Sequence, residues 1–359
     1  MPARPDPLVE SDDEQEEDVE YMLGFVDDPE KPTDLLRHRF PSKVGGVPAW
    51  LDPLNLPTAE QLTCGLTGRT LQFLLQVYCP VDDNPVDAFH RAIFLFVSPR
   101  GDELAKPGAV RALRCQLRRA NPFYGDTPAP ASQLGPKQLQ AAEQQLSLER
   151  DPWKVATVEQ QIAKGDDATV AALAAAGPAL FVEQELIVEP EPEEDEEGAT
   201  GAGSTEVQRL LAAYRSRVAA EGEYDEQELP GELVDELEGA AGPAARTFAA
   251  FQARTALAPE QCLRYCFQPG ATPLWPSASR LPAAGDIPLC PHCGAQRRFE
   301  FQVMPQLLSL MELDAEDPHA PDWGTIAVYT CPSSCSPPPV QGAGGHSAYV
   351  EEFVWVQPS

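Results

Sequence analysis

The chain has 359 residues and a mass of 39.0 kDa, which is enough for more than one domain and a sizeable core. Its 26 Lys+Arg and 56 Asp+Glu residues give a formal net charge of −30, which argues against a protein held on nucleic acid or on an anionic membrane by bulk charge. The charge is uneven. Residues 10–20 carry eight acids and residues 183–238 carry nineteen, whereas residues 34–119 carry eleven bases and eight acids. We therefore expect near-neutral globular parts with acidic arms.

The sequence also indicates a soluble protein. It has no apolar run of the roughly 18 residues that a membrane span requires, and it begins without the apolar stretch of a secretory signal. Nine cysteines in such a chain indicate a reducing compartment, where paired cysteines bind metal more often than they form disulfides. We expect a protein of the cytoplasm, the nucleus or both, with neither a membrane nor DNA as its partner.

The first globular part is predicted to be rich in β-structure. Residues 1–19 read as a disordered acidic tail, and an N-terminal β-rich domain is predicted over 20–124. Order is expected to begin with the apolar run at 21–26. Aromatic and β-branched runs bounded by Gly, Pro and Asp predict strands at 71–78, 92–97 and 110–117.

The middle of the chain has a different composition. Residues 125–258 are predicted to be a helical insert that contains a disordered acidic linker at 183–206, because this stretch is too charged and too rich in Gly and Pro to pack. Helices are predicted at 136–146, 210–218 and 244–254. A second compact domain is predicted over 259–359, with strands at 325–329 and 353–356. The fold class is therefore α+β and β-rich, with two antiparallel β-units.

Four cysteines in the second domain have the spacing of a metal site. Cys290 and Cys293 form a CxxC pair, and Cys331 and Cys335 form a CxxxC pair at the end of a predicted strand. Four thiolates can surround one Zn²⁺ in tetrahedral geometry, with no position left for catalysis. We expect one structural zinc per chain and an outward-pointing His292. Reduced buried thiols or a redox pair remain as alternatives.

An internal repeat links the two domains. Residues 64–77 and 290–303 share Gly, Phe, Gln and Val at offsets of 4, 9, 12 and 13 from their first cysteine. When the two copies are aligned, the four expected metal ligands fall on Cys64, Thr67, Ser98 and Asp102. The pattern predicts two related β-units, of which the first has largely lost its metal. Chance similarity of two short strands is the alternative.

Other chemistry is sparse. No nucleotide-binding or nucleophile-elbow motif is present, so the sequence does not favour an enzyme. Cys262 and Cys266 read either as packing residues or as contributors to a metal site. The arginines of residues 91–119, Arg111 and Arg114 among them, read either as a solvated strand end or as an RNA contact.

Several blocks of the sequence resemble one family. Leu23-Gly-Phe-Val-Asp27, the block at 43–52 and Phe73-Leu-Leu-Gln-Val-Tyr78 resemble the N-terminal part of the programmed cell death protein 2 family. The C-terminal match is stronger and includes the blocks at 286–294, 299–308, 322–331 and 349–357. The resemblance covers roughly 20–124 and 259–357. It implies a duplicated β-rich fold in which Cys290, Cys293, Cys331 and Cys335 hold zinc.

The resemblance also implies a function. This family includes the yeast twenty-S ribosomal RNA accumulation protein, and its members act as dedicated chaperones in biogenesis of the 40S subunit. They capture a nascent small-subunit ribosomal protein, universal protein five (eukaryotic small-subunit protein two), and escort it toward the nucleus. The resemblance therefore implies a co-translational client, cytoplasmic localisation with shuttling to the nucleus or nucleolus, and indirect association with pre-40S particles.

Two other functions remain open. One is an RNA-contacting pre-rRNA processing factor that uses the basic residues of 91–119. The other is a generic interaction adaptor built on a MYND-like zinc module. The family's N-terminal block usually carries such a module, but here Thr67 and Ser98 stand where cysteines are expected, so the module is degenerate. The acidic arms read either as spacers or as a shield for a basic client.

Overall fold

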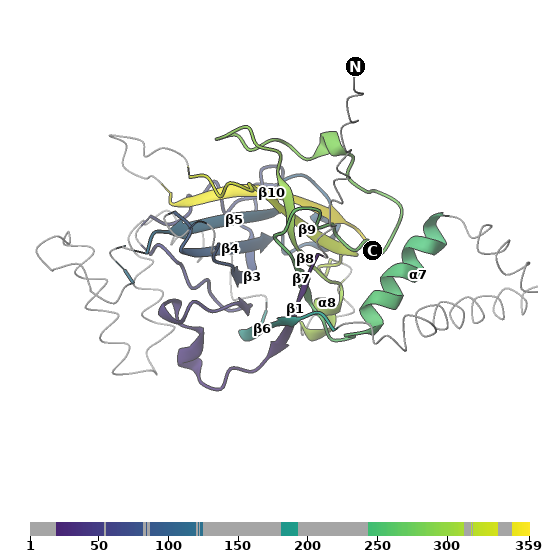
Figure 1. Cartoon of the computed structure of the whole chain (residues 1–359), viewed down its shortest axis with the longest axis horizontal. Helices are drawn as coiled ribbons and strands as arrows, with labels where there is room; N and C mark the ends of the chain where they lie inside the picture. Colours follow the sequence, from purple (N-terminus) through teal and green to yellow (C-terminus); the bar gives the residue numbers. More distant parts are fainter. Residues whose placement is uncertain are drawn as a thin grey trace, which may run out of the picture.

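The computed structural model describes residues 19–124, 181–192, 243–336 and 347–359, apart from residues 54, 82–83, 85–86, 120, 122, 312–316 and 318. Within these residues, antiparallel strands close into one barrel in the order β1-β6-β2-β3-β4-β5-β10-β9-β8-β7 (Figure 1). The strands are β1 (Met22–Asp27), β2 (Lys43–Val44), β3 (Gln72–Tyr78), β4 (His90–Val97), β5 (Val110–Leu117), β6 (Gln184–Pro190), β7 (Leu263–Tyr265), β8 (Arg298–Val303), β9 (Thr325–Thr330) and β10 (Tyr349–Gln357).

The described helices are few. They are α7 (Pro243–Ala256), α8 (Gln306–Leu310) and the short 3₁₀ turns η1 (Pro32–Leu35), η2 (Arg37–Arg39), η3 (Gly101–Glu103) and η7 (Ala284–Asp286). Within the described residues, no helix combines the length and the apolar character needed to cross a bilayer. The β-rich, antiparallel character predicted from the sequence is therefore confirmed.

The individual strand predictions agree closely with the structure. The strands predicted at 71–78, 92–97, 110–117, 325–329 and 353–356 correspond to β3, β4, β5, β9 and β10, and the helix predicted at 244–254 lies within α7. The acidic tail at 1–18 and the helices predicted at 136–146 and 210–218 lie outside the described residues.

One prediction was wrong. Residues 184–190 were placed in a disordered acidic linker, but they form β6, which pairs with β1 over residues 185–190 and with β2 at its start. Leu186, Ile187 and Val188 form a short apolar run that is hidden among glutamates on both sides. Leu186 is 3 % exposed and packs in the main core. The prediction failed because it rested on charge density alone, and the glutamates of β6 lie on the solvated outer face of a strand.

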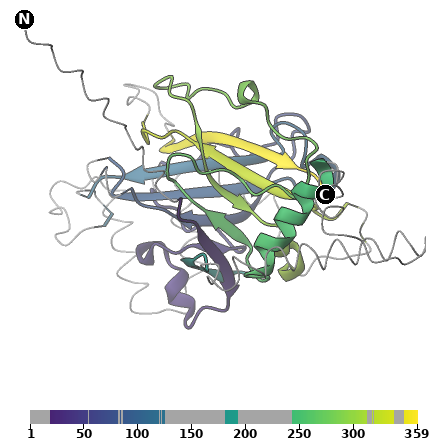
Figure 2. The same cartoon turned by 45° about the vertical axis from the view of Figure 1, so that its right-hand side comes forward.

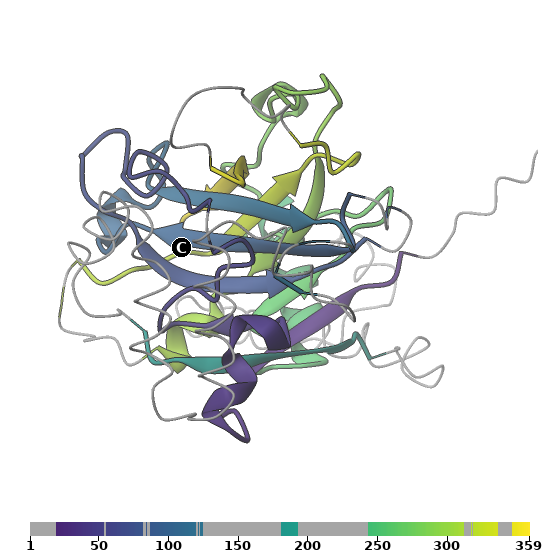
Figure 3. The same ribbon diagram turned by 90° about the vertical axis from the view of Figure 1, so that its left-hand side faces the viewer.

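The two predicted β-units share a single sheet. β5 pairs with β10 over the register Tyr349↔Cys115 to Glu352↔Ala112. At the opposite side of the barrel, β1 pairs with β6 and also with β7 (Figures 1 and 3). Residues 20–124 and 259–359 are thus joined at two seams, and neither stretch closes a barrel without the other.

β3, β4 and β5 are apolar on both faces. One hydrophobic cluster packs against them inside the barrel, and a second packs against their outer face. β4 is buried at all eight positions. Ile93, Leu95 and Val97 face the barrel interior together with residues of β3, β8 and β9, whereas Phe94 and Phe96 face outward and pack under residues 50–62. Burial on both faces explains why the sequence of β4 shows a continuous apolar run instead of alternation.

The two halves also share local detail. β3 and β8 each have a register shift near their start. Gln76 of β3 accepts a hydrogen bond from the Ala49 N–H and donates one to the Pro41 carbonyl. Gln302 of β8 accepts from the Leu274 N–H and donates to the Leu274 carbonyl. Each buried glutamine therefore holds the loop outside its own strand in the same way.

The role of β6 can be tested by mutation. Leu186→Ala should lower the free energy of unfolding by about 2–4 kcal/mol, because it removes a buried side chain and leaves a cavity. Ile187→Ala is the matched control and should cost less than about 1 kcal/mol, since Ile187 is 38 % exposed. Urea unfolding of both variants measures the difference. Equal, small effects would mean that β6 is not part of the cooperative barrel.

Candidate metal centre

Two loops at the ends of neighbouring strands bring four thiols together. Cys290 and Cys293 lie in the turn before β8, and Cys331 and Cys335 lie in the loop directly after β9. The sulfur of Cys290 is 3.4 Å from that of Cys335, and the sulfur of Cys293 is 3.5 Å from that of Cys331. All four sulfurs lie within 4.8 Å of one another, and this is the group with metal-ligand spacing among the described residues.

These separations fit a bound metal and not a pair of disulfides. Four ligands at a Zn–S distance near 2.3 Å in tetrahedral geometry lie about 3.8 Å apart, whereas disulfide sulfurs lie about 2.05 Å apart. All nine cysteines of the chain are unpaired. The sequence prediction of a four-cysteine cluster is therefore confirmed as a group that can hold a metal ion. Zn²⁺ would be fully coordinated by these residues and would play a structural role.

The backbone of the CxxC turn supports the charged form of a thiol. The Gly294 N–H donates to the Cys290 carbonyl at 2.9 Å, and Gly294 adopts φ +74°, a conformation that favours glycine. Burial opposes ionisation of Cys290, but the N–H groups of Cys293 and His292 outweigh it and lower the pKa of Cys290 to about 7. Hydrogen bonds from the thiols of Cys335 and Cys293 lower the pKa of Cys290 as well. Since metal binds thiolates, the turn favours the form of Cys290 that can coordinate a metal. His292 is exposed, as expected.

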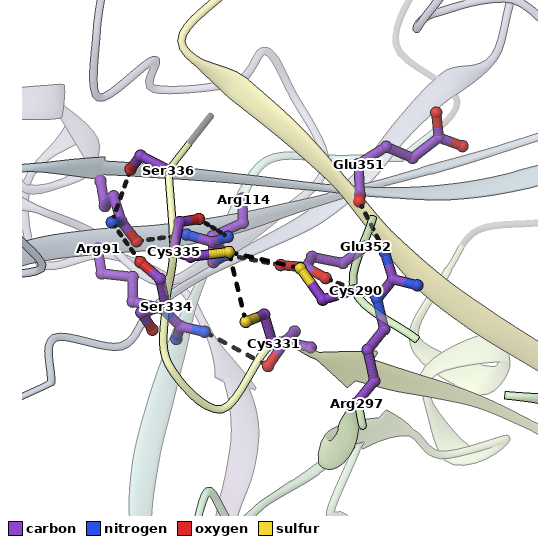
Figure 4. A network of polar contacts seen from close by, with 12 residues as sticks. Arg91, Arg114, Cys290, Arg297, Cys331, Ser334, Cys335, Ser336, Glu351 and Glu352 are labelled. Carbon is purple, nitrogen blue, oxygen red and sulfur yellow. Dashed lines mark hydrogen bonds and ion pairs between the residues drawn. The ribbon is translucent and has the colours of Figure 1, made fainter. Parts of the chain in front are cut away.

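The second cysteine loop is held by residues of the other half of the barrel. Arg114 of β5 donates to the Cys335 carbonyl at 2.8 Å (Figure 4). Gln116, two residues further along the same strand face, donates to the Ser334 carbonyl at 2.6 Å and to the Ser336 hydroxyl at 3.0 Å. The metal loop is therefore attached directly to the N-terminal half.

A buried carboxylate ties both cysteine loops to the β5–β10 seam. Glu352 of β10 accepts from Arg114 at 2.7 Å and from Arg297 at 3.0 Å, and all three side chains are at most 7 % exposed. Arg297 also donates to the carbonyls of Pro288 and Leu289, just before the first cysteine. These contacts connect the cluster to the seam, and removal of any one partner would leave an unpaired buried charge.

The corresponding turn in the first half has the same backbone but different side chains. The Gly68 N–H donates to the Cys64 carbonyl at 2.9 Å, and Gly68 has φ +66°. Ser98, at the position aligned with Cys331, donates to Glu103 at 2.7 Å. Asp102, the residue aligned with Cys335, is 48 % exposed and pairs with Arg100. In the first half, the hydrogen bond between Ser98 and the buried Glu103 thus lies where the second half has the thiols of Cys331 and Cys335.

The remaining residues singled out from the sequence lie elsewhere. Cys262 and Cys266 are buried directly before and after β7, outside the four-cysteine group, and Cys79 and Cys115 are core residues. Arg111 pairs with Glu351 at 2.9 Å. Sequence reasoning missed Arg297, Glu352 and the supporting role of Arg114. The alternation of Arg114 with Gln116 on one strand face was a signal, but their partners lie more than 200 residues away.

The fold and the site define a closed antiparallel β-barrel with a four-thiolate site at a seam between its halves. Family comparison agrees with the sequence resemblance: residues 20–131 match the model described as Programmed cell death protein 2, N-terminal domain, and residues 245–358 match Programmed cell death protein 2, C-terminal putative domain. The chain belongs to the programmed cell death protein 2 family.

Individual relatives extend this result. Programmed cell death protein 2 of Bos taurus is 35 % identical, with 93 % of this chain and 95 % of the relative covered. Programmed cell death protein 2-like of Homo sapiens is 27 % identical over 88 % of this chain and 89 % of the relative. Probable 20S rRNA accumulation protein 4 of Schizosaccharomyces pombe is 34 % identical over 31 % of this chain and 28 % of that protein. No solved structure matches the fold.

Proposed function

We propose that the protein is a non-enzymatic escort chaperone for a nascent small-subunit ribosomal protein, universal protein five, during 40S biogenesis and rRNA maturation. The observation that carries the proposal is the similarity to a relative named for 20S rRNA accumulation, together with family membership over both halves of the barrel. Capture would take place in the cytoplasm during translation. Shuttling of the complex to the nucleus or nucleolus and indirect association with pre-40S particles belong to the same proposal.

Zinc is the metal that we propose for the four-cysteine group. Four thiolates at tetrahedral spacing favour a borderline-soft ion without a redox role, and they leave no open coordination position for substrate. The metal would then stabilise the scaffold and would take no part in a reaction. We further propose that the barrel arose from two related β-units. Its support is the shared offsets of the aligned segments and the matching glutamine contacts of β3 and β8.

The structure gives less support to an RNA contact by residues 91–119. Arg91 and Arg114 are fully buried and paired with Glu300 and Glu352, and Arg111 is paired with Glu351. The guanidinium groups of Arg91 and Arg114 are therefore engaged inside the protein, and that of Arg111 is paired at the surface. Arg118 is 71 % exposed but is paired with Asp87 at 3.1 Å. The adaptor alternative predicts a peptide site at a MYND-like module, whereas the Cys64 turn has no second thiol in the position of Cys331.

The test is affinity purification of the tagged full chain from translating cells, with identification of bound nascent protein and bound mRNA. Enrichment of universal protein five together with its own mRNA is the expected result, because a chaperone that acts during translation recovers the translating ribosome. Recovery of pre-rRNA particles without that nascent protein would favour the processing-factor alternative and would contradict this proposal.

The acidic middle segment provides a second prediction. Deletion of residues 193–238, which spares β6 and α7, should weaken client binding and flatten its dependence on salt, because the deleted stretch is strongly acidic. Replacement of the same residues by a neutral Gly/Ser linker of equal length is the control for spacing. If the linker variant binds as the natural chain does, the segment acts as a spacer only. Titration of the client at several salt concentrations measures the effect.

A further inference from the structure

The outer faces of the two halves of the barrel are covered to different degrees. On the N-terminal half, four outward-facing apolar residues of β3, β4 and β5 are at most 7 % exposed: Phe73, Phe94, Phe96 and Leu113. Residues 50–62 cover them, with the ring of Trp50 5.1 Å from that of Phe94 and 5.9 Å from that of Phe96. An apolar segment with an aromatic anchor therefore seals this face.

The equivalent face of the C-terminal half is sealed only in part. Phe353 and Trp355 of β10 lie opposite Tyr329 and Ala327 of β9, and both outward-facing aromatics are only partly buried. Together with three partly buried neighbours they form an aromatic patch, defined here as Tyr21, Trp275, Ile287, Phe353 and Trp355.

Exposed leucines border this aromatic patch. The light green segment between β7 and β8 extends outward beside the yellow β10 (Figure 2). The Trp355 Nε1–H of β10 donates to the Arg280 carbonyl of this segment at 2.9 Å. Leu281 directly follows Arg280 and is 43 % exposed, and Leu289 lies two residues after Ile287 and is 55 % exposed. Exposed leucines next to partly buried aromatic rings are typical of a protein interaction site.

The described ends of two acidic stretches, Glu20 and Glu191, lie beside the aromatic patch. The Glu20 N–H donates to Gln268 at 3.2 Å, immediately before Tyr21, and the Glu191 N–H donates to the Tyr21 carbonyl at 2.8 Å. In the sequence, residues 10–20 contain eight acids and residues 189–197 contain seven. Glu20 and Glu191, which belong to the two acidic runs, therefore lie at one edge of the patch.

We propose that the aromatic patch is a docking site for a basic polypeptide segment that carries apolar or aromatic anchors. The anchors would be buried between Trp355 and the bordering leucines, in the manner in which Trp50 seals the other half. The acidic runs would attract the flanking Lys and Arg residues and raise the rate of association. The net charge of −30 opposes nucleic acid, anionic lipid and a second copy of the chain as occupants.

This inference rests on the proposed function for the identity of the client, but the patch can be tested separately. The double variant Leu281→Lys with Leu289→Lys removes two exposed apolar side chains and adds charge that repels a basic partner. Leu66→Lys with Leu310→Lys is the matched control, because these leucines are 62 % and 44 % exposed, lie outside the patch and receive the same charge change. Thermal unfolding of both purified full-length variants checks that each remains folded.

Two probes are titrated against the full chain. The first is universal protein five produced in a cell-free translation, and the second is a short synthetic peptide in which Lys and Arg alternate with Leu and Phe. A peptide with Ser in place of Leu and Phe controls for charge alone. We expect the patch variant to lose about tenfold or more in affinity for both probes, the control variant to bind as the unmodified chain does, and the Ser peptide to bind weakly.

The outcomes separate the two proposals. If the unmodified chain binds universal protein five and the patch variant binds it equally well, the docking site is wrong and the escort function stands. If the chain does not bind universal protein five but the apolar basic peptide binds in a patch-dependent way, the client assignment fails and the docking site stands. Equal losses in the patch and control variants, or no binding of the apolar peptide to the unmodified chain, would overturn the docking site.

Discussion

Replacing Cys290 with serine is expected to release the metal and to unfold the whole barrel, including β3, β4 and β5 of the N-terminal half. A structural Zn²⁺ in small metal-binding peptides contributes about 10 kcal/mol or more of coupled folding free energy, which is comparable with the total stability of a domain. The cysteine loops contact Arg114 and Gln116 of β5, and β5 pairs with β10. Loss of the metal therefore removes support from both sides of the seam.

Hydrogen exchange with mass spectrometry measures this effect. Protection should fall in β3–β5 and in β8–β10 together, both in Cys290→Ser and in the natural chain treated with a strong chelator. Metal analysis should give about one zinc per chain before treatment. Cys64→Ser is the matched control: Cys64 occupies the same turn in the first half but lies outside the four-thiol group, so metal content should not change. Loss of protection confined to β8–β10 would show that the halves fold independently.

Breaking the buried ion pair across the barrel interior should have the next largest effect. Arg91 of β4 donates to Glu300 of β8, with one contact at 2.7 Å, and both side chains are 0 % exposed. These strands are not neighbours in the sheet, so the pair crosses the interior. Arg91→Met should lower the free energy of unfolding by about 3–5 kcal/mol, because it leaves the Glu300 charge buried without its partner.

The double variant Arg91→Met with Glu300→Leu separates charge from packing. Its stability should recover most of the loss, since neither charge remains to be solvated. Arg118→Met is the control on the surface. Arg118 pairs with Asp87 at 3.1 Å, but the two side chains are 71 % and 50 % exposed, so the change should cost less than about 1 kcal/mol. Urea unfolding curves of the three variants measure their free energies of unfolding. A double variant that is no more stable than Arg91→Met would argue against the electrostatic explanation.

The same ion pair gives the stability a definite pH dependence. Burial opposes the charge of Glu300, but Arg91 outweighs it and holds the pKa of Glu300 below its ordinary value. A carboxyl group whose folded-state pKa is depressed contributes stability that is fully present above its unfolded pKa, about 4.3, and is lost as the pH falls through the lower folded-state value. Unfolding curves between neutral and acid pH should therefore show a steep loss below about pH 4.3 that is reduced in the double variant.

Local signals in the sequence were sufficient for most strands and for the four-cysteine cluster. Continuous apolar runs such as that of β4 predicted strands that are covered on both faces, and the CxxC and CxxxC spacing predicted the four-thiol cluster. Local signals failed at β6, where the glutamates of a solvated outer face hid a core residue, Leu186. The pattern was short, and its pairing partners lie far away in the chain.

The amino-acid sequence by itself determined the β-rich class, the family and the four cysteines, because each depends on residues that are close together or on motifs read in order. Only the tertiary structure decided that the two halves share one closed barrel and that Arg114, Gln116, Arg297 and Glu352 fasten the cysteine loops across the β5–β10 seam. These contacts join residues that are between 55 and 238 positions apart in the sequence. Their pairing follows from strand register and burial, which no local pattern encodes.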